Sequence, residues 1–150
     1  MRVQRVLFIC TGNTCRSPMA AALFKQKAEE AGLSVDVASA GVFAEQGMPA
    51  TSQAIEVMRK RRLDLTEHEA KSVGMLQYSP NDLLLTMTRS QARMLVAEYP
   101  QLAAQVHTLR EYVGEEGDIS DPFGGDYAEY AATAAELERL IKLLVDKLMQ

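Results

Sequence analysis

The sequence predicts an α/β fold, an open twisted sheet of parallel strands with helices on both faces. Three observations support this prediction. Short apolar runs rich in β-branched residues recur along the chain, longer stretches of helical character lie between them, and the last segment is amphipathic. Strands that alternate with helices pair in parallel through right-handed crossovers, and these crossovers place helices on both faces of the sheet.

The first expected strand is the run Val6–Ile9, whose continuous apolar character is typical of a strand buried on both faces. A helix is expected after the polar loop that follows it. Ser17 is the predicted N-cap, Pro18 suits the first helical position, and Gly32 ends the helix. Residues 35–40 alternate enough to form a second strand.

The middle of the chain predicts a loop over residues 41–49 and a second helix over residues 50–61. The basic run Arg59–Arg62 closes this helix, where cations meet the negative end of the helix dipole; guiding acidic substrates is the alternative role. Residues 63–80 are expected to form a loop with a short helix. Residues 83–87 then form another buried strand.

The last third predicts a helix from a Thr88 cap to about Glu98, broken by Pro100, and a short fourth strand over residues 106–109. A long loop over residues 114–125 is rich in Gly, Asp and Glu. Loops of this length in compact domains are often functional. Residues 127–149 form the closing amphipathic helix.

Composition limits the function. The 150 residues suit a single domain, 1–150, and the net charge of −4 argues against a nonspecific grip on nucleic acid. No apolar run is long enough for a membrane span or a secretory core, so a cytoplasmic protein without membrane contact is expected. The two cysteines, Cys10 and Cys15, are expected to be free thiols, because a disulfide between them would close too short a loop to stabilise much.

The loop after the first strand is the candidate site. In open parallel sheets, ligands bind beyond the carboxyl ends of the strands, where this loop emerges. A loop that wraps into a helix N-terminus points backbone N–H groups inward and forms a cradle for a phosphate group. The loop residues are Cys10, Thr11, Gly12, Asn13, Thr14, Cys15, Arg16 and Ser17.

Each residue type in this loop has a chemical use. Gly12 allows a tight turn, and Arg16 presents a planar fork of donors that can hold two phosphate oxygens. Cys10 lies at the bottom of the positive field and is expected to be a thiolate nucleophile, with Ser17 donating a hydrogen bond to it. A small buried hydrophobe at a strand end is the other interpretation of Cys10. The five-residue spacing to Arg16 favours catalysis.

Phosphate transfer also needs a proton for the leaving group. The long loop offers Asp121 followed by Pro122, which restricts the backbone. A carboxylic acid over the cradle can protonate the leaving atom and then, as carboxylate, activate water. Asp-Pro by itself is only a turn signal.

Residues 6–20, together with the distant Asp121-Pro122, resemble the low-molecular-weight protein tyrosine phosphatase family over nearly the whole chain. The resemblance implies that family's three-layer fold with a four-stranded parallel sheet. It also implies Cys10 as nucleophile, Arg16 as phosphate binder and Asp121 as general acid. Asn13 matches a loop asparagine that holds the loop shape, and Ser17 a hydroxyl that supports the thiolate. Cys15 matches a second loop cysteine, either a reversible oxidative partner of Cys10 or a packed bystander.

Residues 10–20, 39–44 and 121–125 are most similar to the bacterial protein arginine phosphatases of that family. Thr14 stands where tyrosine-directed members carry a larger aliphatic residue, so the resemblance implies that specificity depends on Thr14. A threonine leaves room beside a branched guanidinium, and Asp118 and Asp126 near Asp121 are expected to make the rim acidic. The expected function is therefore hydrolysis of phosphoarginine in proteins through a phosphocysteine intermediate.

The sequence leaves three alternatives open. A phosphotyrosine phosphatase would use the same chemistry, with Phe123 or Phe43 lining an aromatic slot. An arsenate reductase needs a cysteine relay, for which the chain has too few cysteines past Cys15. A noncatalytic phosphate-binding module belongs to another class, but nothing in the loop is disabled.

No metal or cofactor is expected, because His68 and His107 are far apart and neither belongs to a ligand-spaced cluster. The expected partners are phosphorylated protein substrates, and the protein is expected to be a monomer.

Overall fold

The computed structural model describes residues 2–150. Its centre is a four-stranded parallel sheet in the order β2-β1-β3-β4. The sheet confirms the predicted fold class and all four predicted strands, with shifts of at most one residue at their ends. The strands are β1 (Arg5–Cys10), β2 (Asp36–Gly41), β3 (Asp82–Thr86) and β4 (Val106–Thr108).

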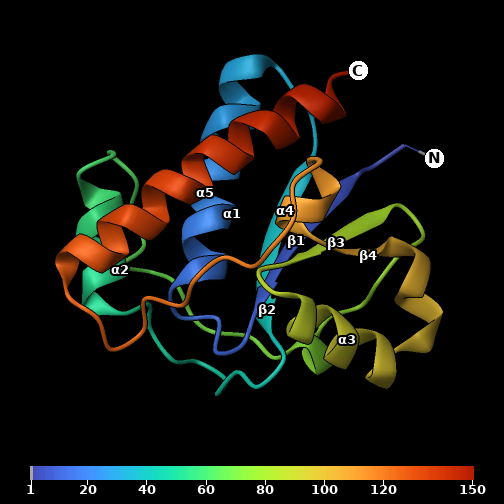
Figure 1. The fold of residues 1–150 in the computed structure, drawn as a ribbon, viewed down its shortest axis with the longest axis horizontal. Coiled ribbons are helices and arrows are strands. Elements are labelled where there is room, and N and C mark those ends of the chain that lie inside the picture. Colours follow the sequence, from blue (N-terminus) through green and yellow to red (C-terminus); the bar gives the residue numbers. More distant parts are fainter. Residues whose placement is uncertain (1) are drawn as a thin grey trace.

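Helices cover both faces of the sheet, which makes three layers (Figure 1). The α-helices are α1 (Arg16–Ala31), α2 (Ser52–Arg59), α3 (Arg89–Glu98), α4 (Leu109–Tyr112) and α5 (Tyr127–Leu148). Two short 3-10 segments are η1 (Val73–Met75) and η2 (Pro100–Gln105). The helix α4 and the segment η2 were not predicted, because each is too short to show a period.

The alternation of side chains along β1 divides the core in two. Val6 and Phe8 face the larger core with α1, α2 and α5, whereas Leu7 and Ile9 face the smaller core with α3 and η2. All four side chains are fully buried. Burial on both faces explains why this strand is a continuous apolar run rather than an alternating one.

The predicted start of α1 was wrong in its details. The helix begins at Arg16 with Cys15 as N-cap and no side-chain cap, so Pro18 occupies the third helical position. Ser17 does not cap the helix because its hydroxyl contacts the Cys10 thiol and the Asn13 amide. A local capping preference is overridden here by contacts within the loop.

Strand pairing brings Gly41 beside Cys10 at the carboxyl end of the sheet. A Cβ at Gly41 would lie 2.5 Å from the Thr11 carbonyl oxygen and 3.1 Å from the Asn13 backbone nitrogen. Such distances are too short for a side chain, so the absence of one lets β2 pass directly behind the loop. The loop is thus supported along its back by backbone.

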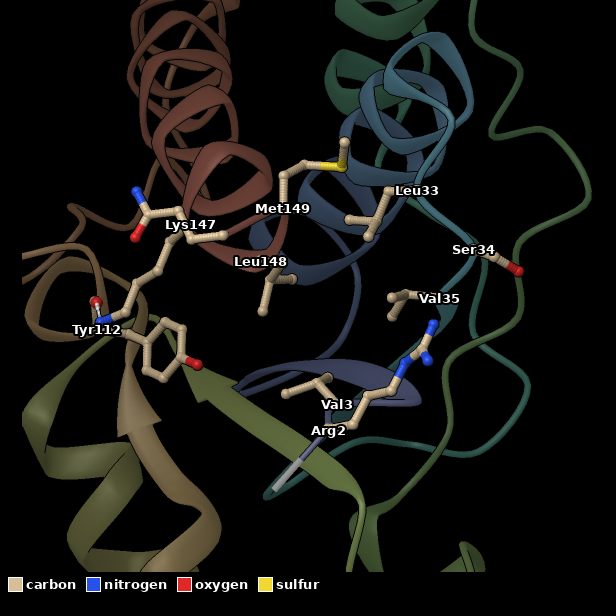
Figure 2. A pocket seen from close by; sticks show the side chains of 10 residues that line it. Arg2, Val3, Leu33, Ser34, Val35, Tyr112, Lys147, Leu148 and Met149 are labelled. Carbon is tan, nitrogen blue, oxygen red and sulfur yellow. Dashed lines mark hydrogen bonds between the residues drawn. The ribbon is translucent and has the colours of Figure 1, made fainter.

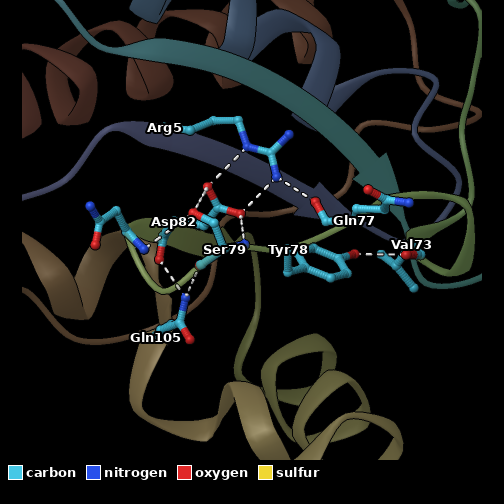
Figure 3. Close-up of polar contacts among 8 residues, drawn as sticks. Arg5, Val73, Gln77, Tyr78, Ser79, Asp82 and Gln105 are labelled. Carbon is cyan, nitrogen blue, oxygen red and sulfur yellow. Dashed lines mark hydrogen bonds and ion pairs between the residues drawn. The ribbon is translucent and has the colours of Figure 1, made fainter.

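The opposite, amino end of the sheet is held by polar contacts (Figure 3). The guanidinium of Arg5 donates to both carboxylate oxygens of Asp82, at 3.0 and 2.7 Å, and so joins β1 to β3. The Gln105 amide donates to the backbone oxygens of Ser79 and Asp82. Asp82 is a buried carboxylate with a full set of partners, which fits a structural role.

Candidate active site

The loop between β1 and α1 is shaped by Asn13. This residue is fully buried and has a left-handed backbone conformation, with φ of 58°. Its side-chain nitrogen donates to the hydroxyls of Ser17 at 2.7 Å and Ser39 at 3.0 Å, and its side-chain oxygen accepts from the Lys71 backbone N–H at 2.9 Å. Asparagine tolerates this backbone conformation better than most residues. The tight turn was predicted at Gly12, but Asn13 is the residue that makes it.

The Cys10 thiol lies at the base of the loop. Its Sγ is 2.9 Å from the Ser17 hydroxyl oxygen and accepts from the Asn13 backbone N–H at 3.3 Å. Both contacts hold the sulfur in place, and the Asn13 N–H points its proton at the sulfur. Cys10 therefore has polar contacts and lines a cavity, which a small packed hydrophobe would not need.

Arg16 is buried and enters the site from the first turn of α1. Its Nη1 donates to the carbonyl oxygen of Ile119 at 2.8 Å, and its Nη2 lies 3.4 Å from Asp121. The buried Nε has no hydrogen-bond partner among residues 2–150. Because Nη1 is anchored, the edge formed by Nε and Nη2 remains for a bidentate contact with two phosphate oxygens.

Asp121 is half-exposed, and the long loop holds it over the site. Its Oδ1 accepts from the Phe123 backbone N–H at 3.0 Å, which sets the side-chain direction.

The Cys15 thiol donates to Asp121 Oδ1 at 3.7 Å. Burial, together with the nearby charges of Cys10 and Asp121, raises the pKa of Cys15 to about 12. Cys15 thus stays a protonated thiol near neutral pH, whereas a nucleophilic cysteine acts as a thiolate.

A cavity of about 200 Å³ joins these groups. Asn13 and Ser17 lie buried behind the cavity and support its wall. All the other predicted site residues line it, along with Phe123: Cys10, Thr11, Gly12, Thr14, Cys15, Arg16 and Asp121. The structure therefore brings together one thiol, one guanidinium and one carboxyl group from two distant segments.

The largest cavity described, about 690 Å³, lies elsewhere, near the ends of α1 and α5 (Figure 2). Its wall is formed by apolar side chains such as Leu33 and Leu148, with Arg2 and Lys147 at the edge. The Lys147 ammonium donates to the Tyr112 carbonyl oxygen and lies over the Tyr112 ring. No paired acid and nucleophile line this cavity, so size alone does not identify the site.

Several residues that shape the site were not predicted. His68 contacts the Asn13 carbonyl oxygen through Nε2 at 2.7 Å, and burial lowers the pKa of this imidazole. Gln91 donates to the Thr11 hydroxyl, and the Ile119 backbone accepts from Arg16. No local pattern could have revealed them, because their partners are backbone or hydroxyl groups far away in sequence.

The acidic rim is only partly present. Asp118 accepts from the Arg89 backbone N–H at 2.9 Å, and Asp126 caps α5 by accepting from Glu129. Both carboxylates thus have structural partners and neither lines the cavity. The basic run is also structural in part, since Arg59 pairs with Glu56 in α2.

Residues 2–150 contain no group of three or more His, Cys, Asp or Glu side chains that could hold a metal ion. His107 instead lies against the ring of Tyr112, with centroids 5.3 Å apart. None of the described helices is long and apolar enough to cross a bilayer.

Comparison with known proteins agrees with this geometry. Residues 5–150 match the family model described as low molecular weight phosphotyrosine protein phosphatase. A protein-arginine-phosphatase of Bacillus subtilis is 43% identical over 144 residues, which cover 95% of each chain.

Two solved structures show the same fold. The YwlE arginine phosphatase carrying a phosphorylated active-site serine has a TM-score of 0.91 and 39% identity, covering 98% of this chain and 97% of the other. A low molecular weight protein tyrosine phosphatase from T. tengcongensis has a TM-score of 0.90 and 46% identity, covering 96% and 99%. The family match extends over nearly the whole chain and includes both the loop and Asp121. This chain belongs to the low molecular weight phosphotyrosine protein phosphatase family.

Proposed function

We propose that this protein hydrolyses phosphoarginine in proteins through a phosphocysteine intermediate on Cys10. The observation that carries the proposal is the single cavity in which Cys10, Arg16 and Asp121 meet. The resemblance to a protein-arginine-phosphatase over 95% of the chain supports the substrate class. A related arginine phosphatase has been captured with a phosphorylated active-site serine, which supports a covalent intermediate at the nucleophile.

In the first step the Cys10 sulfur attacks phosphorus while the phosphoryl oxygens are bound by Arg16 and the loop N–H groups. The S–P bond forms as the P–N bond breaks. Asp121, in its acid form, gives its proton to the leaving nitrogen, which departs as the guanidinium of an unmodified arginine. Asp121 is left as a carboxylate.

In the second step a water molecule attacks the phosphorus of phosphocysteine. The Asp121 carboxylate takes the proton of that water as the new P–O bond forms, and the S–P bond breaks. The products are inorganic phosphate and the Cys10 thiolate, which is stabilised by its contacts with the Ser17 hydroxyl and the Asn13 N–H. The site then returns to its starting state.

Substrate choice is proposed to depend on Thr14, whose side chain lines the cavity beside Gly12. A threonine here leaves room for a branched guanidinium, whereas a larger aliphatic side chain would crowd it. Asp121 can also pair with the cationic remainder of the substrate.

Phosphotyrosine is the second candidate substrate. Phe123 lines the cavity and has 68% of its surface exposed, so it can pack against an aromatic ring. The T. tengcongensis relative, described as a tyrosine phosphatase, also keeps this possibility open.

The cellular setting forms part of the proposal. We propose that residues 1–150 act as one phosphatase domain, a monomer in the cytoplasm, with phosphorylated proteins as partners. The net charge of −4 supports substrates other than nucleic acid.

The test compares phosphate release from phosphoarginine-containing and phosphotyrosine-containing proteins side by side. Wild type should release phosphate faster from phosphoarginine, Cys10→Ser should release none, and Asp121→Asn should be slower by about 10²–10⁴-fold, as expected for loss of a general acid. Asp126→Asn is the matched control, because asparagine caps a helix as well as aspartate does. Equal release by wild type and Cys10→Ser would refute the nucleophile, and faster release from phosphotyrosine would refute the substrate.

A further inference from the structure

Gln91 connects the loop of residues 10–17, here called the phosphate loop, to the end of β3 through one side-chain amide. It lies in the first turn of α3 and is 3% exposed. Its Oε1 accepts from the backbone N–H groups of Met87 and Thr88, both at 3.0 Å. Its Nε2 donates to the hydroxyl oxygen of Thr11 at 3.0 Å.

The orientation of this amide is determined by its surroundings. Backbone N–H groups can only donate, so the side-chain oxygen must face Met87 and Thr88. The NH₂ group is therefore forced toward Thr11. A hydroxyl that accepts at its oxygen must direct its own proton elsewhere.

Thr11 lines the same cavity as Cys10 and Arg16, and its side chain is exposed. Among residues 2–150 the Thr11 hydroxyl accepts from Gln91 and donates no hydrogen bond, so its proton is available to a group that enters the cavity. The Thr11 carbonyl oxygen accepts from the Phe43 N–H at 2.9 Å, which holds the backbone of this residue. The hydroxyl is thus presented as a donor on the cavity wall.

We propose that Gln91 is a positioning residue, which orients the Thr11 hydroxyl so that it donates to an oxygen of the bound phosphate group. The inference rests on the proposed function, since it assumes that phosphate enters this cavity. It adds a side-chain donor to the backbone N–H groups and the Arg16 guanidinium. Gln91 acts only through Thr11 and does not touch the substrate.

The same amide also links the phosphate loop to the long loop that carries Asp121. Met87 donates to Gln91 and, through its carbonyl oxygen, accepts from the Ile119 backbone N–H at 3.0 Å. The Ile119 carbonyl in turn accepts from Arg16. Thr11, Gln91, Met87 and Ile119 therefore form one hydrogen-bonded chain from the cradle to the segment before Asp121.

The experiment replaces the donor without changing the shape. Gln91→Glu keeps an oxygen for Met87 and Thr88 but places a second oxygen against Thr11, whose hydroxyl must then donate away from the cavity. The measured quantity is the competitive inhibition constant of inorganic phosphate. It should rise about ten- to a hundredfold, the range for one hydrogen bond to a charged group. Thr11→Val should weaken phosphate binding by a similar factor, whereas Thr11→Ser, which keeps the hydroxyl, should restore it.

The double variant distinguishes positioning from general damage. If Gln91 acts through Thr11, adding Gln91→Glu to Thr11→Val should weaken phosphate binding little further. Additive effects, or an unchanged inhibition constant in Gln91→Glu, would overturn the inference. Should Gln91→Glu not fold, Thr11→Val still decides, because phosphate binding equal to wild type would also overturn it.

Gln105→Glu provides the matched control. The Gln105 amide also donates from Nε2, but to backbone oxygens at the amino end of the sheet (Figure 3). Its inhibition constant should equal that of wild type, and a rise as large as that of Gln91→Glu would point to a nonspecific effect and overturn the inference. Wild type that fails to bind phosphate would refute the proposed function itself. If wild type binds phosphate but the inhibition constants of the variants differ from those expected above, only the role of Gln91 would be refuted.

Discussion

Asn13 offers a quantitative test of how the phosphate loop is held. Its buried side chain makes three hydrogen bonds, to Ser17, Ser39 and Lys71. At a net contribution of about 1 kcal/mol each, their removal in Asn13→Gly should lower the free energy of unfolding by about 3 kcal/mol. Asn13→Ala should lose roughly 1 kcal/mol more, because alanine is strained at a φ of 58° and glycine is not.

The assay is urea unfolding of wild type, Asn13→Gly and Asn13→Ala, with the midpoint and slope fitted for each protein. Asn81→Ala is the control, since its side chain makes no hydrogen bond among residues 2–150, and its stability should change by less than about 0.5 kcal/mol. A loss below about 1 kcal/mol in both Asn13 variants would contradict the hydrogen-bond argument. Equal losses in the two variants would contradict the backbone argument.

Further predictions concern specificity, reactivity and pH. Thr14→Ile should shift the ratio of initial rates from phosphoarginine toward phosphotyrosine, and an unchanged ratio would count against the role of Thr14. In a Cys10→Ser background, native Cys15 should resist iodoacetamide at neutral pH, because burial and nearby negative charge raise its pKa to about 12; mass spectrometry showing rapid native labelling would contradict this. Burial raises the pKa of Asp82, but hydrogen bonds from Arg5 and Ser79 outweigh it and leave the pKa lowered. The stability advantage of wild type over Asp82→Asn, measured by urea unfolding, should therefore be full above about pH 4 and disappear as the pH falls through the folded pKa. Burial lowers the pKa of His68, so unfolding should become easier as the pH falls below about 6.5, where the unfolded imidazole gains a proton first; a His68→Gln variant with the same pH slope would contradict this.

Local sequence patterns were enough to predict the four strands and the phosphate loop. Val6–Ile9 is apolar without interruption because helices cover both faces of β1, so every residue of this run is buried and must be apolar. Cys10 ends β1 and Arg16 begins α1, so the short spacing between them was enough to predict that both side chains border one loop. The start of α1 at Arg16 was missed, because Ser17 uses its hydroxyl within the site rather than as a cap.

Only the tertiary structure decided what surrounds that loop. Asp121 reaches the cavity because the Ile119 backbone bonds both Met87 and Arg16, contacts that join segments far apart along the chain. His68 and Gln91 support the loop through single hydrogen bonds to a carbonyl and a hydroxyl. A hydrogen bond of this kind constrains one atom and imposes no periodic pattern on its neighbours. Long-range polar contacts therefore cannot be predicted from the sequence and are known only from the folded structure, whereas the burial of a strand can be predicted from its run of apolar residues.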